Sequence, residues 1–243
     1  MGNQQLSDLT NQEVQLIASS YFGDGYFKKP IGDYNMSITL GCVHKDYLTY
    51  KESLCKNLIT TDIKNTDNSL GYNKKGRIYK LRICSCGAIT EFYDLPLYKK
   101  LSLLDELGVA MWFYDDGSLH KNKYFYNLST HSFTLKEQMC ILRILKRFDI
   151  DAVLTKEVKK DGREFTYLRI GRYEGSYEIS KLMSMIPIES MAYKLWSSTT
   201  IHLWSTIQED WKSGKSYDKV EYRKYMRNVQ HNIFVDARRK TKI

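Results

Sequence analysis

The stretches LIASSYFGDGYF (residues 16–27) and GVAMWFYDDGSL (residues 108–119) share one pattern. Each begins as a run of small and apolar residues and ends abruptly at an acidic residue followed by glycine; the acidic residues are Asp24 and Asp116. A single Asp-Gly pair most often marks a turn. Two such stretches, with the acidic residues 92 positions apart, instead predict an internal repeat.

The segments that follow each stretch occur in the same order, which strengthens this prediction. Alternation of polar and apolar residues predicts strands, the tripeptide LRI recurs within a later strand, and helical patterns separate the strands. The matching elements are expected at 35–42, 45–58, 81–83 and 88–98 in the first half and at 124–131, 134–148, 168–170 and 173–184 in the second. Capping boxes at Thr10/Glu13 and Thr134/Glu137 predict where two of the helices begin.

Each half is therefore predicted to run helix, hairpin, helix, hairpin, helix, which gives a mixed α/β (α+β) fold with two pseudo-symmetric halves. The predicted domains are residues 1–100 and residues 101–196, joined by a short linker near 95–104. Residues 197–243 have no counterpart in the repeat, and we expect them to form a basic, helical C-terminal extension.

Composition restricts the class of protein. A formal net charge of +9 and a pI near 9.1 favour a polyanionic partner such as nucleic acid. The five cysteines are scattered without zinc-ligand spacing, which favours reduced thiols. No window approaches the ~18 uninterrupted apolar residues of a membrane span, and the N-terminus lacks a signal-like apolar core. We expect a soluble, intracellular protein that is not secreted and does not bind membranes.

The two acidic residues need a physical reason, because burial disfavours ionised carboxylates and like charges repel. Close approach of two helices requires small residues at the contact, and both stretches supply them: Ala18, Ser19, Ser20, Gly108 and Ala110. If the two helices lie side by side, Asp24 and Asp116 converge and could hold divalent cations. Two cations sharing a phosphate activate water and stabilise the leaving oxygen.

The two stretches resemble the signature helices of the LAGLIDADG homing endonucleases, in the single-chain form with two copies per polypeptide. STHSFT (129–134) and MAYKL (191–195) are also similar to stretches of single-chain members, and the resemblance covers roughly residues 11–196. Ser19, Ser20 and Met111 depart from the usual pattern. The resemblance implies αββαββα halves with saddle-shaped antiparallel sheets, and a monomeric, site-specific double-strand DNA endonuclease that acts on a long asymmetric target.

The resemblance also implies roles for individual residues. Asp24 and Asp116 match the metal-binding carboxylates, and Gly23 and Asp115 would offer backbone carbonyls. The implied cation is Mg²⁺ or Mn²⁺, with Ca²⁺ supporting DNA binding without cleavage, and no small-molecule cofactor is expected. Two lysines match the basic residues near the site, Lys194 and Lys100, with Lys100 preferred over Lys99. For each lysine, a solvated surface charge is an equally good interpretation.

DNA contacts are expected on the polar face of the strands and on two basic hairpin loops. The expected residues are Asn35, Ser37, Thr39, Lys74, Lys75, Arg77, Lys80, Arg82, Asn127, Ser129, His131, Lys156, Lys159, Arg163, Tyr167 and Arg169. For the loop residues, ordinary solvated turns are the alternative.

Two other functions fit parts of this pattern. The first is a nucleic-acid-binding protein on the same scaffold that does not cleave, such as an intron-splicing maturase or a DNA-binding regulator. Retention of both acidic residues favours the enzyme, because binding alone would tolerate Asn or Gly there. The second, a basic structural protein with a coincidental repeat, does not explain the converging carboxylates.

Overall fold

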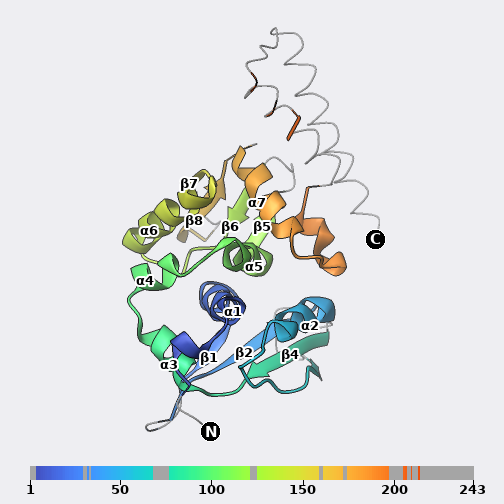
Figure 1. Cartoon of the computed structure of the whole chain (residues 1–243). Coiled ribbons are helices and arrows are strands. Elements are labelled where there is room, and N and C mark those ends of the chain that lie inside the picture. Colours follow the sequence, from blue (N-terminus) through green and yellow to red (C-terminus); the bar gives the residue numbers. More distant parts are fainter. Residues whose placement is uncertain are drawn as a thin grey trace. The chain divides into compact units, whose positions relative to one another are not determined.

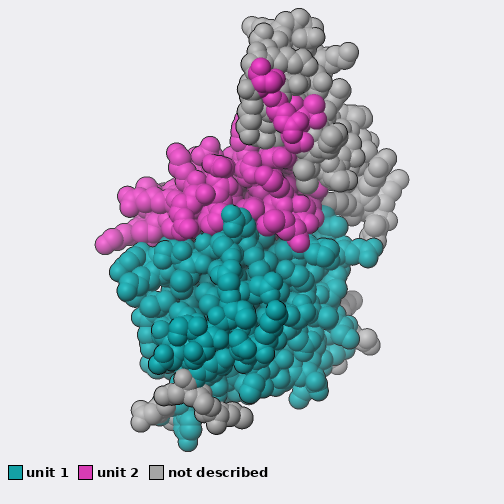
Figure 2. Space-filling view, in the orientation of Figure 1, with its two compact units in different colours: residues 1–116, 186–192 teal, residues 117–185, 193–243 magenta. Residues whose placement is uncertain are grey.

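A computed structural model describes residues 4–29, 32, 34–67, 77–120, 125–158, 161–171, 174–196, 205–206, 209 and 213 (Figure 1). The chain divides into two compact units. Unit 1 consists of residues 1–116 and 186–192, and unit 2 of residues 117–185 and 193–243 (Figure 2). The 3₁₀ helix Glu189–Lys194 crosses the boundary between them.

Unit 1 contains a four-stranded antiparallel sheet with strand order β1-β2-β4-β3 and helices packed on it. Its elements are a 3₁₀ turn (Leu6–Asp8), α1 (Asn11–Phe22), β1 (Tyr26–Lys28), β2 (Ser37–Cys42), α2 (Lys45–Ser53), β3 (Lys64–Asp67), β4 (Arg77–Ile83), α3 (Gly87–Asp94), α4 (Leu97–Ser102) and α5 (Glu106–Asp116). The inward strand positions, such as Ile38, Leu40 and Leu81, are buried against the helices, as the predicted alternation requires.

Unit 2 contains a second four-stranded antiparallel sheet, with the equivalent strand order β5-β6-β8-β7. Its elements are β5 (Gly117–Leu119), β6 (Tyr126–Leu128), α6 (Leu135–Leu145), a 3₁₀ turn (Lys146–Phe148), β7 (Ala152–Val158), β8 (Glu164–Ile170) and α7 (Glu174–Ser184). The matching element order and strand order confirm the predicted repeat and the mixed α/β fold.

The capping boxes predicted at Thr10/Glu13 and Thr134/Glu137 are both present, and each Thr side chain accepts the backbone N–H of its Glu. Glu13 has a second role. It is fully buried and also accepts the backbone N–H groups of residues 56–58. Burial alone would raise the pKa of the Glu13 carboxyl, but hydrogen bonds from Thr10 and this loop hold the pKa below its ordinary value.

Some predicted element boundaries are wrong. The helix expected over 45–58 ends at Ser53, since the backbone of residues 56–58 is bonded to Glu13 instead of continuing the helix. The first strand begins at Ser37, because Asn35 lies outside the ladder and its carboxamide oxygen accepts a hydrogen bond from Thr90. The strand expected over 124–131 is confined to β6.

The two compact units are defined by packing, and the boundary between them, after residue 116, differs from the predicted boundary after residue 100. Helix α5 opens the second repeat in the sequence, yet it packs on α1 and belongs to unit 1. The predicted extension, 197–243, lies outside the described residues apart from 205–206, 209 and 213. No described helix is long and apolar enough to cross a membrane.

Candidate functional site

Helices α1 and α5 lie side by side in unit 1 and form a continuous seam (Figure 1). At the end of the seam where both helices begin, Gln15 donates to the Leu103 carbonyl at 2.8 Å and accepts the Asp105 N–H at 2.9 Å. Gly108 leaves room for this amide, because a Cβ there would overlap the Gln15 side-chain oxygen. The start of α5 is thus held in register with α1 by one buried side chain.

The middle of the seam shows how two departures from the family pattern fit together. Ser19 is small and fully buried, and its hydroxyl lies 3.9 Å from the sulfur of Met111. The large Met111 therefore occupies space that the small Ser19 leaves. One turn further, the rings of Phe22 and Trp112 pack with centroids 5.1 Å apart. These contacts confirm the predicted close approach of the two helices.

The two helices meet again at their acidic ends. A Cβ on Gly23 would lie 2.7 Å from both Cβ and Oδ2 of Asp115 and 3.0 Å from the Ser19 carbonyl. Gly23 is therefore required by its neighbours, since no side chain fits there. Asp24 follows Gly23 directly, and Asp116 follows Asp115 as the last residue of α5. Both predicted metal-binding residues thus lie at the same end of the seam.

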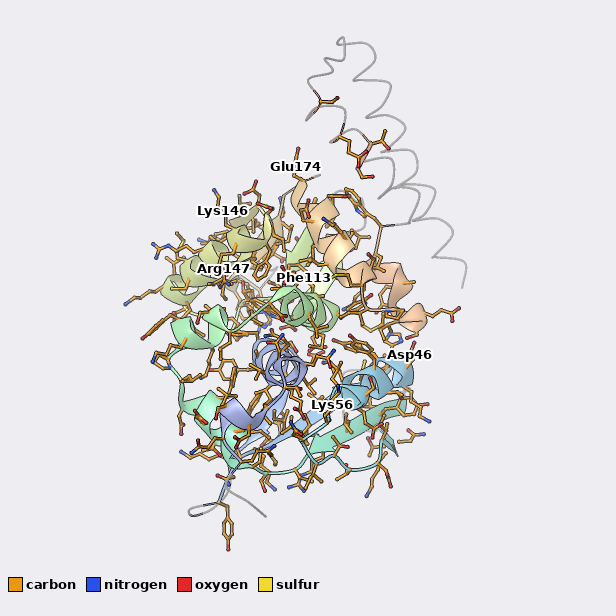
Figure 3. All side chains as sticks on the ribbon, viewed as in Figure 1. Asp46, Lys56, Phe113, Lys146, Arg147 and Glu174 are labelled. Atoms are coloured by element: carbon orange, nitrogen blue, oxygen red, sulfur yellow. The ribbon has the colours of Figure 1, made fainter. Side chains whose placement is uncertain are left out.

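The carboxylate of Asp115 is paired with a lysine that the sequence analysis did not select. Nζ of Lys51, on α2, lies 2.8 Å from Oδ1 and 2.9 Å from Oδ2. Tyr47, one turn earlier on α2, donates its hydroxyl to the Met111 carbonyl at 3.0 Å. Asp46, labelled in Figure 3, accepts two hydrogen bonds from Ser190, at 2.6 Å and 3.2 Å. The contacts of Tyr47 and Lys51 thus hold α2 against the acidic end of α5, and those of Asp46 hold the start of α2 against Ser190.

The charged groups at this end of the seam affect their neighbours. Burial raises the pKa of the Cys42 thiol, and the charges of Asp115 and Asp24 raise it further. The pKa of Tyr47 is raised well above its ordinary value, mainly by burial and then by the Asp115 carboxylate, with a smaller effect of Asp24. Asp24 and Asp115 thus act on the same groups.

The donor set at the helix ends suits a hard divalent cation. It consists of carboxylate oxygens and of carbonyls at two helix C-termini, where the helix dipole also favours positive charge. Within the described part of the chain, no group of three or more His, Cys, Asp or Glu side chains is arranged to hold a metal. A cation held by Asp24 and Asp116 would therefore need further ligands, which phosphate oxygens and water could supply.

Residues 15–175 match the sequence profile of the LAGLIDADG DNA endonuclease family. The chain belongs to this family.

Three solved structures show how far the similarity extends. The homing endonuclease I-WcaI bound to its DNA recognition sequence is 19% identical to this LAGLIDADG chain, with a TM-score of 0.60 over 77% of this chain and 87% of that one. The crystal structure of I-DmoI in complex with DNA and Mn is 12% identical, with a TM-score of 0.47, and covers 72% of this chain and 98% of that one. The N-terminal LAGLIDADG domain of DUF199/WhiA is 15% identical, with a TM-score of 0.42, and the match covers 74% of this chain and 83% of that one. A comparison with curated protein sequences gave no match. The likeness to I-WcaI shows a shared fold.

The two lysines predicted near the site have different surroundings in this LAGLIDADG protein. Lys100 is 5% exposed, and its Nζ lies 4.1 Å from the ring centroid of Tyr21 and 5.2 Å from that of Tyr93. Burial lowers the pKa of Lys100 below its ordinary value. Lys194 lies in unit 2, is half-buried, and its backbone carbonyl accepts the Tyr126 hydroxyl at 2.7 Å. A catalytic role for either lysine remains a prediction.

The predicted DNA-facing residues of the first sheet lie on one face of it. Thr39 of β2 is flanked by Tyr26 of β1 and Arg82 of β4. Lys80 and Arg82 are exposed and Thr39 is half-buried, whereas Ser37 is 4% exposed and presents little surface. The alternation prediction is therefore correct for the face, but it overestimates how accessible Ser37 is.

The second sheet has a hollow on its polar face. Asn127 of β6 is flanked by Ser118 of β5 and Arg169 of β8. The hollow has a volume of about 240 Å³, and its lining residues are Ser118, Asn127, Ser129, His131, Glu157, Phe165 and Tyr167. Four predicted DNA-contacting residues are therefore brought together here. Arg169 lies beside them, donates to the Tyr167 hydroxyl at 3.2 Å, and lies 4.6 Å from the Phe125 ring centroid.

Hydrogen-bonding capacity remains on this face. Oδ1 of Asn127 and Nε of Arg169 are buried and have no hydrogen-bond partner within the described residues. Buried polar groups usually have partners, so an unsatisfied acceptor and donor on adjacent strands indicate a place where a ligand or water binds.

The hairpin-loop residues are only partly described. Lys156 pairs with Glu164 at 2.7 Å and Arg163 with Asp161 at 2.6 Å, both as exposed ion pairs that contribute little stability and can exchange partners. Lys74, Lys75, Lys159 and the side chain of Arg77 lie outside the described residues.

Sequence reasoning missed two kinds of residue. Lys51 follows Tyr47 and Leu48 at the spacing of a buried helix stripe, so its position on the apolar face was a usable signal. Phe165 shares the strand face of Tyr167 and Arg169, and the same alternation could have included it.

Proposed function

We propose that this LAGLIDADG protein is a site-specific endonuclease that hydrolyses both strands of double-stranded DNA with the help of divalent cations. The observation that carries the proposal is the meeting of α1 and α5 at Gly23 and Asp115, with a carboxylate directly after each of these residues. Asp24 is exposed and Asp116 half-buried, and two like charges at adjoining helix ends repel each other. DNA binding alone gives no reason for both carboxylates, whereas a bound cation would offset their repulsion.

Each of the candidate site residues has a separate role in this proposal. Asp24 and Asp116 would hold the cations through carboxylate oxygens, and the backbone carbonyls of Gly23 and Asp115 would add ligands. A bound divalent cation activates water and stabilises the leaving oxygen of the phosphodiester. Water would attack phosphorus and the bond to the 3′ oxygen would break, which leaves a 5′-phosphate and a 3′-hydroxyl. Lys100 and Lys194 would assist by offsetting charge on the reacting phosphate.

The two polar sheet faces support duplex DNA as the partner. Lys80 and Arg82 can meet phosphates, and the hollow of the second sheet offers amide, hydroxyl, imidazole and carboxylate groups that suit base edges. The net charge of +9 favours the same partner. We further propose that the protein acts as a monomer inside the cell, on a long asymmetric site, without a small-molecule cofactor.

The test is cleavage of a randomised duplex library in Mg²⁺ or Mn²⁺, with Asp24→Asn in parallel and with DNA binding measured in Ca²⁺. We expect the wild-type protein to cut a defined subset of sequences and the variant to bind the same subset without cutting. A wild-type protein that binds specific duplexes in Ca²⁺ but leaves them intact in both other cations would overturn the endonuclease proposal in favour of a maturase or a regulator.

A further inference from the structure

Lys51 is a buried lysine in unit 1. Its side chain is 2% exposed, and the side chain of Asp115, its partner, is 3% exposed. Taking an ammonium and a carboxylate out of water is costly, and such a pair often adds no net stability over apolar residues of similar size. Stability alone is therefore a weak reason for this pair, and its position suggests another one.

Two successive turns of α2 hold two successive turns of α5. The Tyr47 hydroxyl donates to the carbonyl of Met111 at 3.0 Å. Lys51, one turn after Tyr47, binds Asp115, one turn after Met111, through both carboxylate oxygens. The Tyr47 ring centroid also lies 4.5 Å from the Lys51 ammonium, a cation–π contact that helps to keep the charge in place. This double attachment fixes the last turn of α5, which ends in Asp116.

Lys51 also changes the charge that the helix ends offer to a cation. Three carboxylates, those of Asp24, Asp115 and Asp116, lie at or beside this end of the seam. The number of carboxylates at a site is a main determinant of its affinity for divalent cations. Because the Asp115 carboxylate is bound on both oxygens by Lys51, its charge is offset and two carboxylates remain for the cations.

Lys51 and Asp115 each occur in only one of the two copies of the repeat. Lys51 is seven residues after the N-cap of α2, His44, and Ile141 is seven residues after the N-cap of α6, Thr134. The residue preceding the acidic residue that both motifs share is Asp115 in the second motif and Gly23 in the first. One copy of the repeat thus supplies an additional carboxylate and the other supplies a cation to neutralise it.

We infer that Lys51 is a positioning residue of the proposed endonuclease site, which holds the Asp115 carboxylate away from the divalent cations so that Asp24 and Asp116 alone bind them through side chains. The inference rests on the proposed function, because it concerns the cation site of that function.

The experiment measures Mn²⁺ binding to the full chain without DNA, by the loss of the free Mn²⁺ signal in electron paramagnetic resonance. We expect Lys51→Met to bind Mn²⁺ at least about tenfold more tightly than wild type, because a third carboxylate is released. The double variant Lys51→Met/Asp115→Asn should return to the wild-type affinity. Lys45→Met, an exposed lysine on the same helix, is the matched control and should change nothing.

A folded Lys51→Met protein with unchanged Mn²⁺ affinity overturns the inference, and so does tighter binding that Asp115→Asn does not reverse. If Lys51→Met does not fold, Lys51→Gln replaces it, because the neutral amide also leaves the Asp115 carboxylate without its counter-charge, and the same tighter Mn²⁺ binding is expected. Should neither fold, the double variant carries the test through amide hydrogen exchange of residues 113–116. We expect that exchange to be at least about tenfold faster than in wild type, and an unchanged rate overturns the inference.

Asp24→Asn in the same assays separates the two proposals. If Asp24→Asn weakens Mn²⁺ binding and abolishes cleavage while Lys51→Met changes nothing, the Lys51 inference fails and the endonuclease proposal stands. If Asp24→Asn alters neither, the proposed function fails, whatever the result at Lys51.

Discussion

The acidic ends of α1 and α5 differ at one position, and that difference organises their surroundings. The first motif ends Gly23–Asp24 and the second ends Asp115–Asp116. Gly23 has no side chain, so the Asp115 side chain occupies the space beside it, and Asp115 forms an ion pair with the buried Lys51. The shared residue of each pair is the proposed cation ligand, whereas the differing residue determines how the two helix ends pack. Repeated motifs can therefore keep their chemistry while their packing diverges.

The largest effect should come from the residues that the two ends share. Asp24→Asn and Asp116→Asn should each slow cleavage by about 10⁴-fold, equivalent to about 5 kcal/mol of lost transition-state stabilisation. Single-turnover cleavage in Mg²⁺ measures this, with fluorescence anisotropy in Ca²⁺ as the check that DNA binding survives. Near-wild-type cleavage by either variant would show that the two ends are not equivalent and that the cation site is misplaced.

The differing position should affect folding more than chemistry. Asp115→Asn leaves the Lys51 ammonium buried without its counter-charge, and breaking a buried pair in this way costs about 3 kcal/mol or more. Urea unfolding measures the loss, and Lys51→Met/Asp115→Asn should recover most of it. In the same preparation, Asp115→Asn should cut DNA far better than Asp116→Asn. The reverse ranking would mean that the assignment of ligands along α5 is wrong by one residue.

A third variant makes the first end more like the second. Gly23→Ala places a Cβ 2.7 Å from Asp115, so the helix ends must separate, at a cost of about 2 kcal/mol in unfolding free energy. Gly41→Ala is the control, because its Cβ would meet Ile78 at an ordinary 3.8 Å. Equal stability of these two variants would mean that the contact between the helix ends is not as close as described.

The smallest effect compares two capping boxes. Glu13 binds a loop in addition to its own helix, whereas Glu137 caps α6 through Thr134. Glu13→Gln should cost about 1.5 kcal/mol and Glu137→Gln about 0.5 kcal/mol in urea unfolding.

The contribution of Glu13 to stability should also depend on pH. Because the pKa of Glu13 is lowered in the folded protein, its contribution is present above the ordinary value of 4.5 and is lost as pH falls through the lowered pKa. Unfolding free energy measured against pH should therefore decline less steeply below 4.5 in Glu13→Gln than in wild type. Identical pH profiles would contradict the assignment.

Much of this fold could be predicted because it depends on local pattern. Alternation located the strands, the capping boxes located two helix starts, and the repeat ordered the elements in both halves. The end of α2 could not be predicted, because Glu13, more than 40 residues away in sequence, binds the backbone that would have continued the helix.

The placement of the candidate site was predictable where it depended on spacing. The seam between α1 and α5 and the positions of Asp24 and Asp116 followed from the two motifs. The Lys51–Asp115 pair joins residues 64 positions apart in sequence, and its two members belong to different halves of the repeat. The compact units also depend on such long-range contacts, so α5 belongs to unit 1 although it opens the second half of the sequence.

The close contact of Gly23 with Asp115 has a consequence for ancestry. In a symmetric dimer of identical chains, a residue next to the two-fold axis faces its own copy, so both helix ends would carry the same side chain. Two aspartates at this point would collide and repel, since even a single added Cβ lies 2.7 Å from its neighbour. The pairing of glycine with aspartate can arise only where each copy mutates independently. Duplication of the motif is therefore a precondition for this helix contact, and the second motif transplanted into a homodimer should not assemble.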